Sequence, residues 1–220
     1  MSLQIRNDPF TQRLQQIGQW IAQGLLQPAA QALNEAQAQH PKDVRVALMG
    51  VRLAQQAGNL AGAVQAARRA VALEPGWFVA VTELALQLAA QGQFSEAMEH
   101  ARHAVALAPK EPRVLHSAAN VAEVAGDGQQ ALTWARTALQ LDPQNHPLRQ
   151  DYAGMLYRDR QYKQAQDEYN RVLQAQPGNE NALRNLLTCA LQLGDQSEAQ
   201  RLADVLIIRS PDDEQMRYWH

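Results

Sequence analysis

The sequence has few aromatic residues and a single cysteine among its 220 residues. Phe, Trp and Tyr make up 5% of the chain, which argues against a core of large rings, and an apolar share of 46% argues against intrinsic disorder. Cys189 has no second cysteine to pair with, so an internal disulfide is excluded and a reducing compartment is favoured. Val and Ile do not alternate with polar residues, so the sequence does not predict strands.

No charge of either sign dominates the chain. The formal net charge is −2 and the pI is about 6.3, so nothing attracts nucleic acid or an anionic membrane over long range. No apolar run approaches the length of a membrane span. We therefore expect no nucleic-acid partner and no insertion into a membrane. The polar residues from Gln4 to Asp8 do not resemble a signal peptide, so we expect a cytoplasmic protein, or a periplasmic one if a leader has been removed.

The motifs of enzymes and metal centres are missing as well. The chain has no phosphate-binding glycine loop, no paired-carboxylate pocket and no nucleophile elbow. His100 and His103, beside Glu99, are spaced to present two imidazoles to a metal, but the sequence offers no third ligand. Cys189 has no histidine partner, and we interpret it as a small buried hydrophobic residue. We predict no catalytic residues, no metal site and no cofactor.

What the chain does have is a period of 34 residues, the spacing of six of its prolines. These are Pro41, Pro75, Pro109, Pro143, Pro177 and Pro211. An alanine stands twelve residues before every one of them, and a glycine stands seventeen residues before all but Pro177, where Arg160 replaces it. Alanine lets two helices approach closely, glycine permits a tight turn, and proline ends a helix. Each repeat therefore predicts a helix, a turn, a second helix and a stop, and the fold class is all-α.

Six repeats account for most of the chain. We place them at residues 10–43, 44–77, 78–111, 112–145, 146–179 and 180–213. Asp8 is expected to cap the first helix, with Pro9 in its first turn, and Asp43 to cap the second repeat. Residues 1–9 are interpreted as a leader or a vector-derived segment. Residues 214–220 are interpreted as the start of a capping helix or of a further repeat.

This pattern resembles the tetratricopeptide repeat family from Phe10 to Asp213. In that family the unit is also 34 residues long, with Ala at its twentieth place and Pro at its thirty-second, and both places match in all six repeats. The family's aromatic residue at the twenty-fourth place is present here only as Tyr169, which is a departure from the pattern. The resemblance implies an α-solenoid of helix pairs that winds into a right-handed superhelix, with the first helix of each pair lining a concave groove.

The groove-facing places implied by the resemblance differ between the two halves of the array. In repeats one to three they are mostly apolar, and they comprise Leu14, Ile21, Leu48, Met49, Val79, Leu86 and Ala89, with Arg45, Arg52 and Glu83 among them. In repeats four to six they are rich in hydrogen-bonding groups: Arg113, His116, Asn120, Glu123, Gln150, Asp151, Tyr157, Arg158, Asn181, Arg184, Asn185 and Thr188. Such groups suit the backbone and acidic side chains of a peptide, whereas the alternative interpretation is an ordinary solvated helix face.

We therefore expect a non-enzymatic scaffold that binds a protein or peptide segment in the concave groove through those twelve residues. One branch of the family grips a C-terminal carboxylate with a clamp that needs Lys at the fifth place, and no repeat has Lys there. The alternative function is that of the repeat portion of a larger bacterial enzyme, of the methyltransferase or glycosyltransferase type. The helix that the sequence starts after Pro211 favours this alternative.

Overall fold

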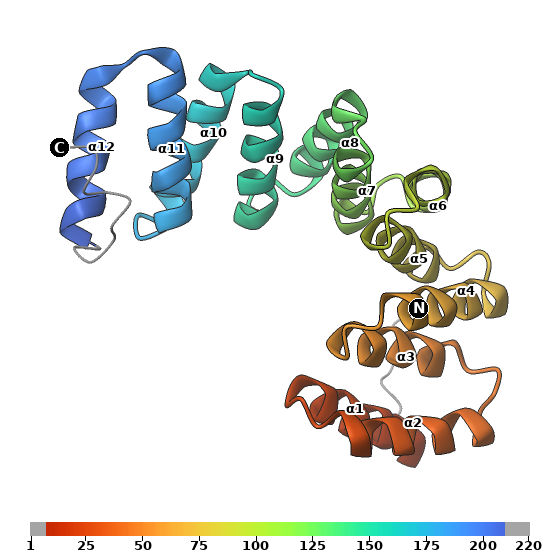
Figure 1. Cartoon of the computed structure of the whole chain (residues 1–220). Helices are drawn as coiled ribbons and strands as arrows, with labels where there is room; N and C mark the ends of the chain where they lie inside the picture. The colour runs from red at the N-terminus through yellow and green to blue at the C-terminus, as the bar shows by residue number, and fades with distance from the viewer. Residues whose placement is uncertain (1–7, 210–220) are drawn as a thin grey trace. The chain divides into compact units, whose positions relative to one another are not determined.

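The computed structural model describes residues 8–209, which form twelve α-helices and no strand (Figure 1). The helices are α1 (Pro9–Ala22), α2 (Leu26–Gln39), α3 (Val44–Gln56), α4 (Leu60–Leu73), α5 (Phe78–Ala90), α6 (Phe94–Leu107), α7 (Pro112–Val124), α8 (Gly128–Leu141), α9 (His146–Arg158), α10 (Tyr162–Ala175), α11 (Glu180–Leu193) and α12 (Gln196–Arg209). The all-α expectation is confirmed. The expectations for a leader before residue 8 and for a helix over residues 214–220 lie outside the described residues.

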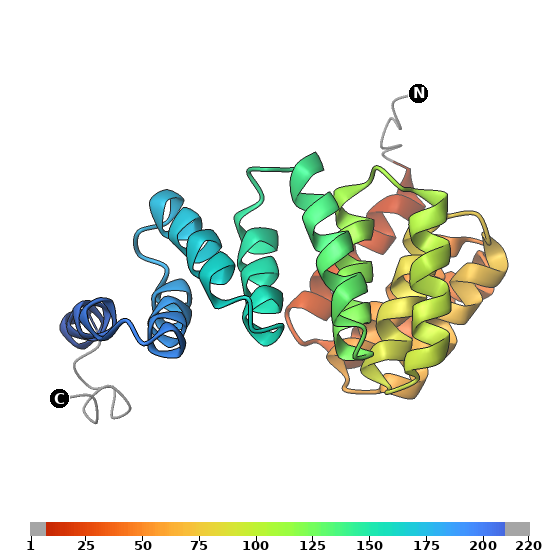
Figure 2. The ribbon, with the colours of Figure 1, turned by 90° about the horizontal axis from the view of Figure 1, so that it is seen from above.

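The helices pack as consecutive pairs, which Figure 2 shows from above. The chain separates into two compact parts, an N-terminal half (Met1–Pro109) that contains α1 to α6 and a C-terminal half (Lys110–His220) that contains α7 to α12. Within each half, the second helix of one pair packs against the first helix of the next, as α4 does against α5 and α10 against α11. Stacking of this kind buries apolar faces that a single pair leaves open.

One residue in each turn between paired helices has a positive φ, and it is the residue that the glycine series predicts. The values are 75° for Gly24, 68° for Gly58, 80° for Gly92, 84° for Gly126 and 72° for Gly194. Arg160, which replaces glycine in the fifth repeat, has a φ of 63°. Because a side chain is strained in this region, the turn is the physical reason for glycine at this place.

The alanine series is buried, as expected for small residues at contacts between helices. Ala29, Ala63, Ala97, Ala131 and Ala165 are each 0% exposed, and Ala199 is 6% exposed. The predicted helix caps are confirmed too: Asp8 accepts a hydrogen bond of 2.8 Å from the Thr11 amide, and Asp43 accepts one of 2.9 Å from the Arg45 amide. The two caps fix the starts of α1 and α3, and the buried alanines lie on the second helix of every pair.

Candidate functional site

All twelve residues predicted in the C-terminal half lie on α7, α9 and α11, the first helices of its three pairs, and none of them is buried. Two contacts show that the residues of α7 and α9 share one face. The Nε2 atom of His116 lies 2.7 Å from the Oδ2 atom of Asp151, and the guanidinium of Arg158 binds the carboxylate of Glu123. The structure therefore brings these four residues together, but it does so by pairing them with one another.

A further contact joins α9 to the start of α11. The amide nitrogen of the Asn179 side chain donates a hydrogen bond of 2.9 Å to the Oε1 atom of Gln150, while the Asn179 oxygen caps α11 by accepting from the Ala182 amide. On α11 itself, the Thr188 hydroxyl donates to the Asn185 carbonyl, and the Arg184 guanidinium lies 4.0 Å from the Glu180 carboxylate. Much of the predicted hydrogen-bonding capacity thus serves contacts within the chain.

The side chains of three of the twelve residues form no polar or ring contact with another described residue. These residues are Arg113, Asn120 and Asn181. Tyr157 on α9 contacts only a ring, that of Tyr162, with the centroids 5.3 Å apart. These side chains are the part of the predicted surface best placed to meet a partner.

Tyr169 is buried next to this surface, and the sequence did not single it out as a site residue. It comes from α10 and is 2% exposed, and a Cβ added at Gly154 would lie 3.6 Å from its hydroxyl and 3.4 Å from the Arg158 guanidinium. Burial raises the pKa of Tyr169 to about 12, although a hydrogen bond with Asn185 opposes the shift. The phenol therefore stays neutral and reaches the polar face through the space that Gly154 leaves. The sequence held a signal for this arrangement: Gly154 falls at the ninth place, which the family resemblance assigns to the groove, in the only repeat with an aromatic twenty-fourth residue.

In the N-terminal half, the first helices border two hollows lined by both apolar and polar side chains. One of about 540 Å³ lies between α1 and α3 and includes Leu14 and Gly18 in its lining. A second, of about 220 Å³, lies between α3 and α5 and includes Leu48 and Val79. Arg45, Met49 and Arg52 line both.

The groove assignment of one residue of the first repeat is wrong. Ile21 is 6% exposed because it packs into a core with α2, whose contribution includes Ala32 and Leu33. Leu14 belongs to the same core and also lines the larger hollow. The family's numbering of places therefore does not transfer to every position of α1.

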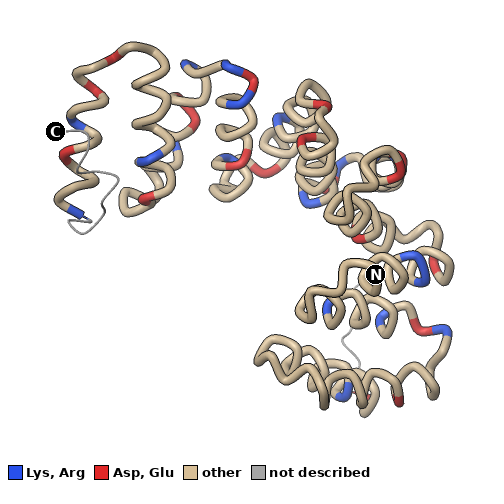
Figure 3. Tube along the Cα trace, viewed as in Figure 1, with Lys and Arg blue, Asp and Glu red and all other residues tan. Residues whose placement is uncertain are grey.

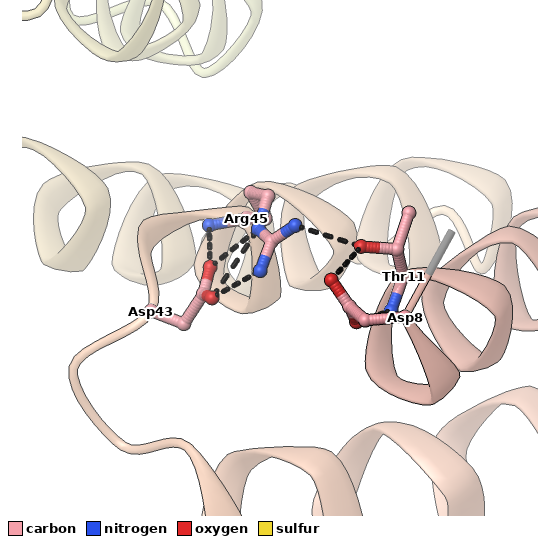
Figure 4. Close-up of polar contacts among 4 residues, drawn as sticks. All are labelled: Asp8, Thr11, Asp43 and Arg45. Carbon is pink, nitrogen blue, oxygen red and sulfur yellow. Dashed lines mark hydrogen bonds and ion pairs between the residues drawn. The ribbon is translucent and has the colours of Figure 1, made fainter. Parts of the chain in front are cut away.

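Arg45 is committed to contacts within the chain (Figure 4). Its Nη2 atom lies 2.7 Å from Asp43, its Nη1 atom donates to the Thr11 hydroxyl at 3.2 Å, and its guanidinium carbon lies 5.2 Å from the centre of the Phe10 ring. The hydrogen bonds from Arg45 are the main reason why the pKa of Asp43 is lowered. This network links the starts of α1 and α3, so Arg45 stabilises the stacking of two repeats.

His100 and Cys189, the residues considered for metal and thiol chemistry, pack against neighbouring side chains. Within residues 8–209, no three His, Cys, Asp or Glu side chains gather as metal ligands would. The imidazole of His100 lies 3.8 Å from Glu96, and the same carboxylate pairs with Arg68 at 2.7 Å. Cys189 is buried, as interpreted from the sequence, and burial raises the pKa of its thiol to about 11. None of the described helices has both the length and the apolar character needed to span a bilayer.

Comparison with known proteins points to one family. Two family models, each described as tetratricopeptide repeat, match residues 82–146 and 156–218. No curated protein matches the sequence.

Several solved structures share the fold. One is PilW, titled a widely conserved type IV pilus biogenesis factor, with a TM-score of 0.85 and 16% identity over 96% of this chain and 98% of that one. Another is from a study of pilF of Pseudomonas aeruginosa, with a TM-score of 0.77 and 19% identity over 96% of both chains. A third is YrrB, titled a TPR protein with an unusual peptide-binding site, with a TM-score of 0.66 and 16% identity over 85% of this chain and 96% of that one. Because the identities are only 16% to 19%, these structures show that the fold is shared and nothing more.

Proposed function

Because the chain belongs to the tetratricopeptide repeat family, we propose that it is a non-enzymatic scaffold that binds a segment of a partner protein on the faces of α7, α9 and α11. The proposal is supported by the side chains that these three helices carry at the places that the family resemblance assigns to the groove, and by the contacts that join α7 to α9. The side chains of Asn120 on α7 and Asn181 on α11 form no hydrogen bond or ion pair with other described residues, and Tyr157 on α9 lies between their helices in the sequence. Carboxamides donate and accept hydrogen bonds at once, as an extended peptide backbone requires.

The polar pairs around these residues support the same use. The pairs His116–Asp151 and Arg158–Glu123 each join α7 to α9, so a ligand meets preorganised side chains. Less conformational entropy is then lost on binding, which strengthens the affinity that a given set of contacts provides. Arg184 on α11 adds a permanently charged planar donor group, which suits a carboxylate or backbone carbonyls.

The test is a pull-down with the intact chain, followed by affinity measurements on the captured protein partner. We expect Asn120→Ala and Arg184→Ala each to weaken binding by about ten-fold or more, while circular dichroism shows an unchanged fold. The matched control is Arg102→Ala, since Arg102 is exposed on α6, a second helix, and contacts no other described residue. Weaker binding in the control together with unchanged binding in both test variants would contradict the proposal.

A narrower candidate is a role in type IV pilus assembly. It is supported by the whole-length likeness to PilW, which carries that description, and to pilF, with TM-scores of 0.85 and 0.77. Deleting the gene in the organism that encodes it should reduce surface pili, and the parent gene should restore them where an Asn120→Ala, Arg184→Ala double variant does not. Unchanged piliation in the deletion strain rules this role out. Fractionation of the same strain distinguishes a cytoplasmic location from a periplasmic one.

The alternative weighed from the sequence, an array attached to a methyltransferase or glycosyltransferase domain, makes a different prediction. The full reading frame then encodes a catalytic domain beside the repeats, and Arg184→Ala lowers modification of one substrate without altering the chemistry. The scaffold proposal expects no turnover by the purified chain. A turnover that one point substitution within the chain abolishes would refute it.

A further inference from the structure

We propose that the C-terminal half has a second binding groove, between the second helices α10 and α12, and that residues 212–219 of this chain occupy it. The groove has a volume of about 530 Å³, which lies within the range of ligand-binding pockets. The binding face proposed above lies on first helices and includes none of the residues that line this groove. The inference therefore goes beyond the proposed function and does not depend on it.

The base of this groove is apolar. Leu183 and Leu186 on α11 form it and are 7% and 1% exposed, while Leu173 on α10 and Val205 on α12 are half-buried at its sides. Covering the apolar surface that remains is favourable, so the groove suits a ligand with large apolar side chains.

The side of the groove formed by α12 is positively charged. Figure 3 marks the charged positions along the chain, and those that line the groove are Arg201 and Arg209. Arg201 pairs with Glu198 through two hydrogen bonds of 2.7 Å. The Nη1 atom of Arg209 donates to the Pro177 carbonyl at 2.9 Å, and no carboxylate within residues 8–209 pairs with this guanidinium. A ligand that brings a carboxylate to Arg209 therefore gains a charge-assisted hydrogen bond.

Two carboxamides in the lining favour an extended ligand. Asn170 and Gln174 are exposed on α10, about one helical turn apart, and no hydrogen bond joins either side chain to another described residue. An extended backbone has N–H and C=O groups that need partners, and a carboxamide can donate and accept at once. These two side chains can therefore bind the backbone of a segment that lies along α10.

The residues that follow α12 have the chemistry of this groove in a matching order. Acidic residues come first and large apolar ones follow: Asp212, Asp213 and Glu214, then Met216, Tyr218 and Trp219. Arg209 is the last lining residue of α12, and Val205 lies about 6 Å further back along the helix. An extended chain advances about 3.3 Å per residue, so a segment that turns back along α12 has the length to bring its carboxylates to Arg209 and its apolar side chains to Val205.

This place differs from the one that a further repeat would take. In the array, the first helix of each pair packs against the second helix of the pair before it, as α11 does against α10. A helix that continued the array would therefore pack on α12 at the side away from α10. Gln200 marks that other side, since it is exposed, does not line the groove and is about 140° from Val205 around the helix.

The test is disulfide trapping in the full chain. One variant carries Gln174→Cys and Gln215→Cys, and the matched control carries Gln200→Cys and Gln215→Cys. Cys189 stays in both, because it is buried and the raised pKa of its thiol, about 11, keeps it unreactive. Oxidation by glutathione is followed on non-reducing gels, and mass spectrometry identifies the bonded positions. We expect the bond between positions 174 and 215 to form within one chain about ten-fold faster than the bond in the control.

Charge reversal tests the role of Arg209. Arg209→Glu should slow the bond between positions 174 and 215 by about five-fold, and adding Asp212→Lys with Asp213→Lys should restore the rate. Loss of the hydrogen bond to Pro177 cannot explain such a rescue, since both variants lack that bond. Asn120→Ala, in the face proposed above, should leave the rate unchanged, so each proposal can fail without the other.

Three outcomes would overturn the proposal. A control rate equal to or above that of the Gln174→Cys variant would place the segment away from the groove, at the side where a further repeat packs. Bonds found only between chains would mean that the occupant is a second copy. An unchanged rate in Arg209→Glu would mean that the carboxylates of the segment do not pair with this arginine.

Discussion

At the scale of one residue, Arg160 occupies the turn position that is glycine in the other five repeats. Its φ of 63° is close to the values of 68° to 84° for the five turn glycines, so the turn keeps its geometry, and the Cβ of Arg160 strains the backbone there. The side chain is exposed, and it forms no hydrogen bond or ion pair with another described residue that would offset this cost.

We expect Arg160→Gly to stabilise the protein by about 1 kcal/mol, because relief of left-handed strain outweighs the greater flexibility of glycine in the unfolded chain. Urea denaturation should show a higher midpoint. The reciprocal control is Gly126→Ala, at a φ of 84°, which should lower the midpoint. A lower midpoint for Arg160→Gly would mean that the turn of the fifth repeat is not strained.

The raised pKa of Glu83 predicts how the stability of the protein depends on pH. Burial raises the pKa of Glu83 above its ordinary value of 4.5, so the folded state holds the proton more tightly than the unfolded state does. This carboxyl therefore lowers the free energy of unfolding at pH values above its folded-state pKa, and the cost disappears below 4.5. Glu83→Gln keeps an oxygen that accepts from Gln87 and removes the charge.

We expect Glu83→Gln to raise the urea midpoint at about pH 7 and to leave it unchanged at about pH 3, below the ordinary glutamate pKa. The measurement is a series of denaturation curves at pH values between these limits. Glu99→Gln, at an exposed glutamate of α6, should not produce the gain at neutral pH. A gain of equal size at both pH values would show that the effect of Gln is packing and not charge.

At the scale of the element, several helices begin at a capping residue that the sequence marks. Asn145 caps α9 by accepting a hydrogen bond of 3.1 Å from the Leu148 amide, and Pro147 in the first turn has no N–H to satisfy. Asn179 does the same for α11, and its side-chain nitrogen also reaches Gln150. Asn179 therefore fixes the start of α11 and also positions Gln150, a residue of the proposed binding face.

We expect Asn145→Ala to destabilise the protein by about 1 kcal/mol, the usual loss when a helix cap is removed. The control is Asn181→Ala on α11, an exposed asparagine without a contact among the described residues, which should change stability by less than about 0.5 kcal/mol. Thermal unfolding followed by circular dichroism measures both variants. Equal losses in the two would mean that the cap contributes no more than an ordinary surface residue.

At the scale of the whole molecule, stability comes from stacking between neighbouring repeats. Helices inside the array, such as α10, pack against helices on two sides, whereas α12 packs extensively against α11 alone among the described helices. Local opening should therefore be easiest at α12.

Hydrogen exchange tests this expectation. We expect amides of α12 to exchange faster than those of α10, because fewer packing contacts break when α12 opens. Mass spectrometry of peptic fragments resolves the two helices. Slower exchange in α12 than in α10 would contradict the expectation and indicate that another part of the chain covers α12.

The sequence by itself determined the fold, because the residues that carry the period act through the backbone. A glycine such as Gly92 permits a positive φ, a proline such as Pro109 ends a helix, and an alanine such as Ala97 permits close approach wherever the repeat occurs. These effects are local or depend on size alone, so their spacing predicts helix pairs without knowledge of the neighbours. The same reasoning anticipated the caps at Asp8 and Asp43.

The tertiary structure alone decided what each face offers to a partner. Contacts such as Arg45 with Thr11 and His116 with Asp151 join residues 34 and 35 positions apart in the sequence, and they exist only because stacking brings neighbouring first helices together. The packing of Ile21 against α2 likewise removed it from the predicted groove. A residue's place in a repeat tells which way it points on a helix, but the side chains it meets depend on how the next repeat packs. The use of Arg45 within the chain, and the exposure of Arg52 beside Met49, follow from that packing.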